Sequence, residues 1–149
     1  MTPLDYTGYD TRLTGYALVR DEHGRILLSR WVEGHKPTWT CPGGGIEFGE
    51  QVVDGIRREL REETGCIVEV GRLLDVRTFE IPAEQRIRHA KRPMRAIQVF
   101  HTAAVTGGEL RFETDGSSDM AGWFAPDEIR QMPHVSTVDH LLALAGLDA

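Results

Sequence analysis

Cysteine is scarce in this chain, because Cys41 and Cys66 are the only two among 149 residues. They lie far apart, and no paired histidines accompany them, so they cannot form a zinc cage by themselves. A scaffold rich in disulfides is excluded for the same reason. We therefore expect both thiols to be reduced.

Long apolar runs and a leader-like N-terminus are absent as well. No stretch is long enough to cross a bilayer, and the first residues, MTPLDYTGYDTRL, do not combine a positively charged start with an apolar segment. We expect a protein without a membrane partner, located in the cytoplasm.

Positive charge is in deficit, with 17 Lys and Arg against 23 Asp and Glu and a net charge of −6. This balance argues against a nucleic acid polymer as partner and favours a divalent cation or a small anionic substrate. The ordinary content of hydrophobic residues, 40%, indicates a soluble globular protein. Because no repeat, low-complexity tract or linker interrupts the chain, we expect one domain over residues 1–149.

The first half of the chain is rich in short β-prone segments. Gly15–Val19 and Ile26–Trp31 flank the turn-like residues 21–24, which predicts two antiparallel strands. A third strand is expected at Thr38–Cys41. Proline and three glycines follow in Pro42–Gly45, and this composition predicts an irregular loop with close backbone approach.

A helix is expected over residues 50–64, because apolar residues recur at three- and four-residue spacing. Gly65 supplies a natural stop, and Gly49 is a weak candidate for the N-cap. Helices and strands therefore mix without strict alternation, which indicates an α/β fold with a mixed sheet. The remaining expected elements are strands at Ile67–Ile81, with a break near Gly71, and at Ala96–Val105, a short helix at Pro126–Gln131, and a final helix capped by Ser136 or Thr137 that carries Val138, Leu141, Leu142 and Ala145 on one face.

Three carboxylates crowd one face of the expected helix 50–64. Glu59, Glu62 and Glu63 stand at i, i+3 and i+4, where like charges destabilise a helix by roughly 0.2–0.5 kcal/mol per pair. One interpretation is a solvated face on which the glutamates pair with interleaved arginines, such as Arg58 with Glu62. The glycine-rich segment one helix length upstream favours another. Carboxylate and carbonyl oxygens together suit Mg²⁺ or Mn²⁺, and such ions keep open positions for substrate phosphates.

The segment PGGGIEFGEQVVDGIRRELREETGC resembles the Nudix box, G-x5-E-x7-R-E-U-x-E-E-x-G-U, in which U is aliphatic. The last aliphatic position holds Cys66, a mild departure because buried cysteine behaves as a small apolar residue. The matching positions are Gly44, Glu50, Arg58, Glu59, Leu60, Glu62, Glu63 and Gly65.

This resemblance implies a Nudix-like α/β/α sandwich and a metal-dependent hydrolase. In such enzymes the residues that match Glu59, Glu62 and Glu63, with the carbonyl of Gly43, bind divalent ions. The implied reaction is attack by a metal-polarised water on a phosphorus of a nucleoside triphosphate or of a nucleoside diphosphate linked to a further group. The proton acceptor is expected to be one glutamate of the box or an acid on a distal loop. We favour Glu62, because Glu59 and Glu63 are i, i+4 partners able to share the metal.

Arg58 is a candidate catalytic residue of a different kind. It is expected to orient a carboxylate of the box, such as Glu50, by hydrogen bonding. The alternative is a surface salt bridge worth about 0–1 kcal/mol.

Substrate contacts are less well determined by the sequence. Many relatives carry an acid where this chain has Met120, so Asp119 takes over, another acid of the same loop (Glu113 or Asp115) reaches in, or fewer ions bind. Trp39 stacks on a base or belongs to the core. The basic segment 86–95 is a phosphate-gathering loop or a solvated connection. The candidate substrate-binding residues are Gly44, Gly45, Arg30, Trp39 and Asp119.

The class of nucleotide also stays open. The position of Pro82 after the box is similar to that of a proline in relatives that cleave ADP-ribose, whereas the motif of coenzyme A-cleaving relatives is absent. A surplus or damaged nucleoside triphosphate, ADP-ribose and other nucleotide sugars are all candidates. The alternative function is a nucleotide-sensing domain without turnover, but such domains typically lose glutamates of the box. A homodimer is possible, since similar proteins often form one.

Overall fold

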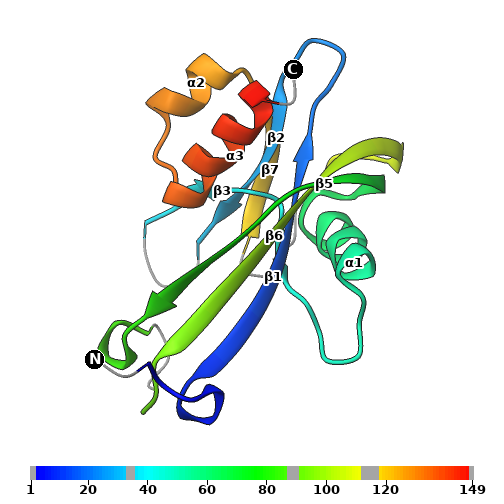
Figure 1. The fold of residues 1–149 in the computed structure, drawn as a ribbon. Helices are drawn as coiled ribbons and strands as arrows, with labels where there is room; N and C mark the ends of the chain where they lie inside the picture. Colours follow the sequence, from blue (N-terminus) through cyan, green and yellow to red (C-terminus); the bar gives the residue numbers. More distant parts are fainter. Residues whose placement is uncertain (1–2, 33–35, 87–90, 112–117, 148–149) are drawn as a thin grey trace.

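The computed structural model describes residues 3–32, 36–86, 91–111 and 118–147. Strands dominate these segments, and three α-helices accompany them (Figure 1). The α-helices are α1 (Val52–Thr64), α2 (Pro126–Gln131) and α3 (Ser136–Leu147). The strands are β1 (Asp10–Val19), β2 (Ile26–Trp31), β3 (Thr38–Thr40), β4 (Gly43–Gly45), β5 (Cys66–Ile81), β6 (Met94–Gly108) and β7 (Ser118–Phe124). Two short 3-10 helices lie at Tyr6–Gly8 and Ala83–Gln85.

The strands form two sheets. The four-stranded sheet has the order β4-β1-β6-β5 and is mixed, because β1 and β6 run parallel while the other pairs are antiparallel. The three-stranded sheet, β3-β2-β7, is antiparallel. The two strands expected on either side of residues 21–24 are present, but they join different sheets, so the antiparallel pairing between them is limited to one bridge, Arg20 to Ile26. The turn between them is present, with the Asp21 carboxylate accepting from the backbone N–H groups of His23 and Arg25.

The prediction of an irregular loop at Pro42–Gly45 is also wrong. Gly43–Gly45 forms β4, a short strand at the edge of the four-stranded sheet, in register with Thr14–Tyr16. Glycine is tolerated at an edge where backbones approach closely. A Cβ on Gly43 would overlap the Gly15 carbonyl oxygen, and its φ of 140° is itself unfavourable for residues with a side chain.

Two apolar clusters show how the layers are stacked. Ala17, Val19 and Leu27 face α1 on one side, whereas Leu18 and Leu28 face α2 and α3 on the other. Successive residues of β1 and of β2 thus alternate between two cores, as a strand buried on both faces requires. The predicted α/β/α arrangement is confirmed, with α1 on the opposite side of the strands from α2 and α3 (Figure 1).

Several element boundaries differ from the predictions. β1 begins at Asp10, whereas Gly15 was expected. α1 begins at Val52, with Gln51 and not Gly49 at the N-cap position, and the Gln51 side chain makes no capping hydrogen bond. Gly65 ends it in the left-handed conformation, as predicted. α3 begins at Ser136, so the prediction that Ser136 or Thr137 caps it is wrong, because both residues lie inside the helix.

Two further boundaries concern strands. β5 runs through the expected break near Gly71, where its pairing with β6 shifts register. β7 was not predicted as a strand.

In the described part of the chain, none of the helices is long and apolar enough to cross a membrane.

Candidate active site

One face of α1 packs into the core, and the neighbouring face bears the carboxylates of the site. Ile56 and Leu60, one turn apart, are fully buried in the cluster that contains Ala17. Glu59 follows Ile56 by three residues and Glu63 follows Leu60 by three, so both glutamates lie on the adjoining face. That face meets β4, so the same packing that buries the apolar stripe brings two carboxylates against the glycine strand.

The Glu63 carboxylate is bound to the backbone of β4. Its side chain is buried, with 7% of the residue exposed, and its Oε2 accepts the Gly43 N–H at 2.9 Å. The Ala17 N–H donates to the Pro42 carbonyl at 3.1 Å, so this carbonyl points toward β1. In an antiparallel pair, successive residues point their N–H and carbonyl groups alternately toward and away from the partner strand. The N–H and the carbonyl of the next residue, Gly43, therefore both point away from β1. The Gly43 carbonyl is thus directed off the sheet edge, on the side where Glu63 lies.

The Glu59 carboxylate lies against the next glycine of β4. A Cβ on Gly44 would stand 3.0–3.3 Å from the carboxylate atoms of Glu59, which is tighter than ordinary packing. The glycine therefore permits the close approach of this side chain to the strand. Glu59 and Glu63 together place two carboxylates along the exposed edge of β4.

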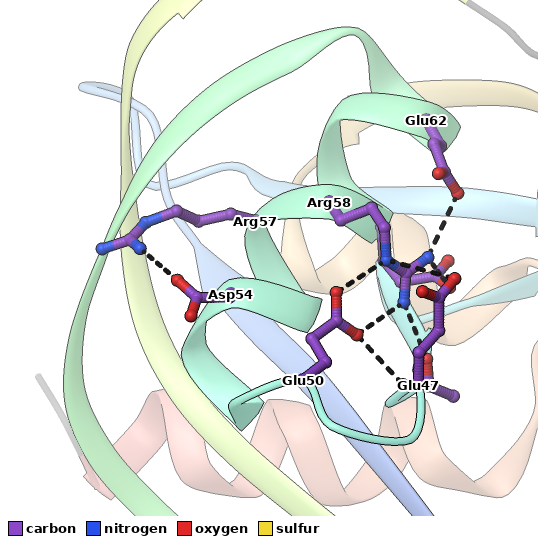
Figure 2. Close-up of polar contacts among 8 residues, drawn as sticks. Glu47, Glu50, Asp54, Arg57, Arg58 and Glu62 are labelled. Atoms are coloured by element: carbon purple, nitrogen blue, oxygen red, sulfur yellow. Dashed lines mark hydrogen bonds and ion pairs between the residues drawn. The ribbon is translucent and has the colours of Figure 1, made fainter.

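Arg58 organises the other carboxylates of the site (Figure 2). Its Nε and Nη2 donate to the two oxygens of Glu50, at 2.9 and 3.0 Å. Nη1 donates to Glu59 at 3.0 Å and to the more exposed Glu62 at 3.4 Å, and Nη2 reaches the Gly45 carbonyl at 3.0 Å. The expected contact between Arg58 and Glu50 is present, and the guanidinium ties α1 to the loop that leads into it.

The bidentate contact makes Glu50 sensitive to acid. The hydrogen bonds from Arg58, supported by the backbone N–H of Glu47, lower the pKa of Glu50 from 4.5 to about 2. A lowered pKa in the folded protein means that its contribution to stability is present above pH 4.5 and is lost as the pH falls toward 2. We expect Glu50→Gln to flatten the pH dependence of the unfolding midpoint in this interval, as measured by thermal melts. An unchanged profile would contradict the contact.

Arg58→Lys tests whether the fork geometry of this arginine matters. Lysine keeps the charge but cannot donate two parallel hydrogen bonds to Glu50 while reaching Glu59. We expect kcat to fall about 10–100-fold, the range for groups that orient metal ligands. A loss of stability without a change in kcat would show that Arg58 is only a salt bridge.

Glu62 is more exposed than Glu59 and Glu63, although it shares the Nη1 of Arg58 with Glu59. Half of the Glu62 side chain is exposed, and its carboxylate is turned toward Arg58. Among the described residues, no three carboxylate, imidazole or thiol side chains converge into a metal cage. The expected set of three ligands is thus divided into Glu59 and Glu63 at the strand and Glu62 at the rim.

The donor set nevertheless fits a hard divalent cation. Arg58 forms ion pairs with four carboxylates, those of Glu47, Glu50, Glu59 and Glu62, which leaves three negative charges more than the single guanidinium neutralises. All the available donors are oxygens, the ligands that Mg²⁺ and Mn²⁺ prefer, and Mg²⁺ is usually bound by few protein ligands and several waters. Glu59, Glu63 and the Gly43 carbonyl would hold such an ion, with Glu62 within one helical turn.

The other candidate substrate residues are placed as follows. Trp39 is 9% exposed and packs in the core, with its ring 4.7 Å from that of Phe124, which favours the packing role over stacking on a base. The Arg30 guanidinium lies 6.0 Å from the Trp39 ring. Asp119 falls in β7 at a register shift, between Met120, which pairs with Arg30, and Ser118. The Asp119 side chain lies outside the described residues, as do Glu113 and Asp115. Met120 packs against the core.

The basic segment 86–95 lies partly outside the described residues, at positions 87–90. Arg86 and Arg92 both bind the Asp10 carboxylate at the start of β1. Arg86 also donates to the backbone carbonyl of Arg92. These two arginines therefore hold the connection between β5 and β6 against the N-terminal end of the sheet.

The sequence did not identify the polar and aromatic residues on the sheet face next to Gly43. Tyr16 lies so close that its Cδ1 would stand 2.9 Å from a Cβ on Gly43. Arg77 and Gln98 extend the same face on β5 and β6. Alternation along the strands was the available signal, but the pairing of β6 with both β1 and β5 is needed to bring these residues together.

Comparison with known proteins agrees with this geometry. The family model described as the NUDIX domain matches residues 10–144. The chain belongs to the Nudix family. A NUDIX hydrolase from Nitrosomonas europaea superposes with a TM-score of 0.77 at 20% identity, covering 93% of this chain and 90% of that one. The MutT NUDIX hydrolase from Burkholderia pseudomallei gives 0.71 at 26% identity, covering 91% and 98%.

Among curated relatives of this Nudix hydrolase is a MutT-like protein from Streptomyces ambofaciens. It is 33% identical over 84% of this chain and 71% of its own length. An ADP-ribose pyrophosphatase from Methanocaldococcus jannaschii is 31% identical over 66% of this chain and 53% of its own length. The chain thus spans only about half the length of some curated relatives that it matches.

Proposed function

We propose that this Nudix hydrolase cleaves a phosphoanhydride bond in a nucleoside triphosphate, or in a nucleoside diphosphate linked to a further group, with the help of Mg²⁺ or Mn²⁺. The observation that carries the proposal is the edge of β4. There the buried Glu63 carboxylate, the Glu59 carboxylate and the outward Gly43 carbonyl lie together.

Each residue of the site has a proposed role in this reaction. Glu59, Glu63 and the Gly43 carbonyl would hold the divalent ion, which when bound neutralises phosphoryl oxygens and lowers the pKa of water. The exposed Glu62 carboxylate would accept a proton from the attacking water, since it is open to solvent and held near Glu59 by Arg58. Arg58 is a positioning residue that fixes Glu59.

Gly44 and Gly45 would contribute to substrate binding in different ways. The space that a side chain on Gly44 would fill is taken by the Glu59 carboxylate, whereas a side chain on Gly45 would face the Arg12 guanidinium, 3.5 Å from its Nη2. A phosphate chain would therefore approach the strand beside Gly45, where this positive charge lies. The names of the relatives include a MutT-like protein, an RNA pyrophosphohydrolase and an ADP-ribose pyrophosphatase. They support a substrate that contains a nucleotide and a pyrophosphate bond.

A substrate panel tests the proposal directly. The purified protein is incubated with nucleoside triphosphates, ADP-ribose, dinucleoside polyphosphates and nucleotide sugars, with Mg²⁺, with Mn²⁺ and with a chelator. We expect phosphate or pyrophosphate release from at least one class, abolished by the chelator. Nucleotide binding without turnover across the panel would contradict the proposal and support a sensing domain.

A further inference from the structure

A second group of polar residues lies beyond Gly43, on the sheet face that α3 partly covers. Its floor is Phe100 on β6, which is fully buried. Three side chains gather around this ring: Tyr16 stacks on it at 5.6 Å, His140 meets it edge-on at 5.0 Å, and the Arg77 guanidinium carbon lies 5.8 Å from its centre. β5, which carries Arg77, continues beyond the end of α3 (Figure 1).

Arg77 is held in place by a hydrogen bond from its Nε and not by its terminal nitrogens. Its Nε donates to the Gln98 Oε1 at 2.7 Å, and the buried Gln98 donates in turn to Thr137 on α3 at 3.3 Å. Phe79 lies on another side of the guanidinium, at 5.9 Å. In the part of the chain that the structure describes, Nη1 and Nη2 of Arg77 have no hydrogen-bond partner. A fixed pair of donors is therefore presented to an incoming group.

Asp75 supplies an acceptor beside these donors. It precedes Arg77 by two residues on β5 and lies on the same face, because its Oδ2 contacts His140 Nε2 on α3 at 2.7 Å. The Asp75 side chain is 37% exposed, and Oδ1 has no partner among the described residues. The two terminal nitrogens of Arg77 and the Asp75 Oδ1 thus belong to the same face of β5, two residues apart.

This group adjoins the proposed phosphate site. Tyr16, which stacks on Phe100, is also the residue against which Gly43 packs. Cys41, two residues before Gly43, is fully buried in the same apolar cluster as Phe100. A ligand with phosphates at β4 would therefore extend its other end toward Arg77 and Asp75.

We propose that Arg77 and Asp75 bind the guanine base of the substrate, Arg77 through O6 and N7 and Asp75 through the N–H groups at N1 and N2. The inference rests on the proposed function, because the base is located relative to the proposed phosphate site. It names guanine nucleotides as the preferred substrate class.

Guanine fits this pair better than adenine or a second phosphate does. Arginine donates two hydrogen bonds to O6 and N7 of guanine, whereas adenine presents an amino donor in place of O6. The donors of guanine at N1 and N2 match the Asp75 acceptor, and a phosphate would meet that carboxylate with like charge. The Phe79 ring, which is 39% exposed beside the Arg77 guanidinium, suits a flat heterocycle.

Equilibrium binding of GMP, IMP and AMP tests the proposal without metal or turnover. We expect wild-type protein to bind GMP about 10–100-fold more tightly than AMP in calorimetric titrations. Arg77→Met keeps the apolar stem and should weaken GMP and IMP by about tenfold or more while leaving AMP unchanged. Asp75→Ala should weaken GMP more than IMP, because IMP lacks the amino group at position 2. The matched control is Arg130→Ala, an exposed arginine on α2.

Several results would overturn the proposal. One is equal affinity of the wild-type protein for GMP and AMP, or no GMP binding at millimolar concentration. Another is an equal loss of GMP, AMP and ribose 5-phosphate binding in Arg77→Met, which would assign Arg77 to phosphate. Since these titrations need no hydrolysis, selective GMP binding can be observed even if the substrate panel shows no turnover.

Discussion

Glu63→Gln is expected to lower kcat/KM on any accepted substrate by at least about a hundredfold, more than the usual loss for groups that only orient metal ligands. Glutamine is isosteric, and its side-chain oxygen can still accept the Gly43 N–H that Glu63 binds at 2.9 Å. The fold should therefore be retained while the negative charge beside β4 is lost. Steady-state kinetics with Mg²⁺ and thermal melts of the same preparation measure the two effects separately.

The matched control is Glu22→Gln, which removes a carboxylate from the exposed turn between β1 and β2. This variant should keep wild-type kinetics. If Glu63→Gln retained wild-type turnover, the buried carboxylate would be structural, and the assignment of the metal site to the edge of β4 would be wrong.

Gly43→Ala is expected to have the largest effect on stability. An added Cβ would overlap the Gly15 carbonyl oxygen and stand 2.8 Å from the Tyr16 Cα, both of which belong to the backbone of β1 and cannot rotate away. The φ of 140° adds strain for any residue other than glycine. We expect the free energy of unfolding to fall by about 2 kcal/mol or more, as measured by urea denaturation.

Gly107→Ala provides the comparison for this substitution. A Cβ there would meet Ile67 at an ordinary distance of 3.8 Å, so the free energy of unfolding should change little. Equal stability of the Gly43 and Gly107 variants would mean that β4 does not approach β1 as closely as the structure shows.

The sequence predicts the helix of the site well, because local signals determine it. Apolar residues at three- and four-residue spacing place Ile56 and Leu60 inward, which orients Glu59 and Glu63. Gly65 ends the helix in the left-handed conformation that glycine favours. The contact of Arg58 with Glu50 follows from the same helical geometry and the short loop before it.

The arrangement of strands could not be predicted in this way, because pairing depends on residues far apart in the chain. β1 pairs with β6, more than eighty residues later, and only this pairing places Gln98 beside Thr14. Three glycines formed an edge strand where their composition predicted a loop, since an edge needs hydrogen bonds on one side only. The register of β5 with β6 places Arg77 and Asp75 near Phe100, and the pairing of β1 with β6 adds Tyr16 to this group.

The proposed hydrolysis depends most on a divalent ion held by the carboxylates at β4. Calorimetric titration of the wild-type protein with Mg²⁺ and with Mn²⁺, alone and beside a non-hydrolysable nucleotide, tests this claim most directly. We predict saturable uptake that is lost in Glu63→Gln and retained in Glu22→Gln. The absence of uptake under all these conditions, or equal uptake by Glu63→Gln, would contradict the account.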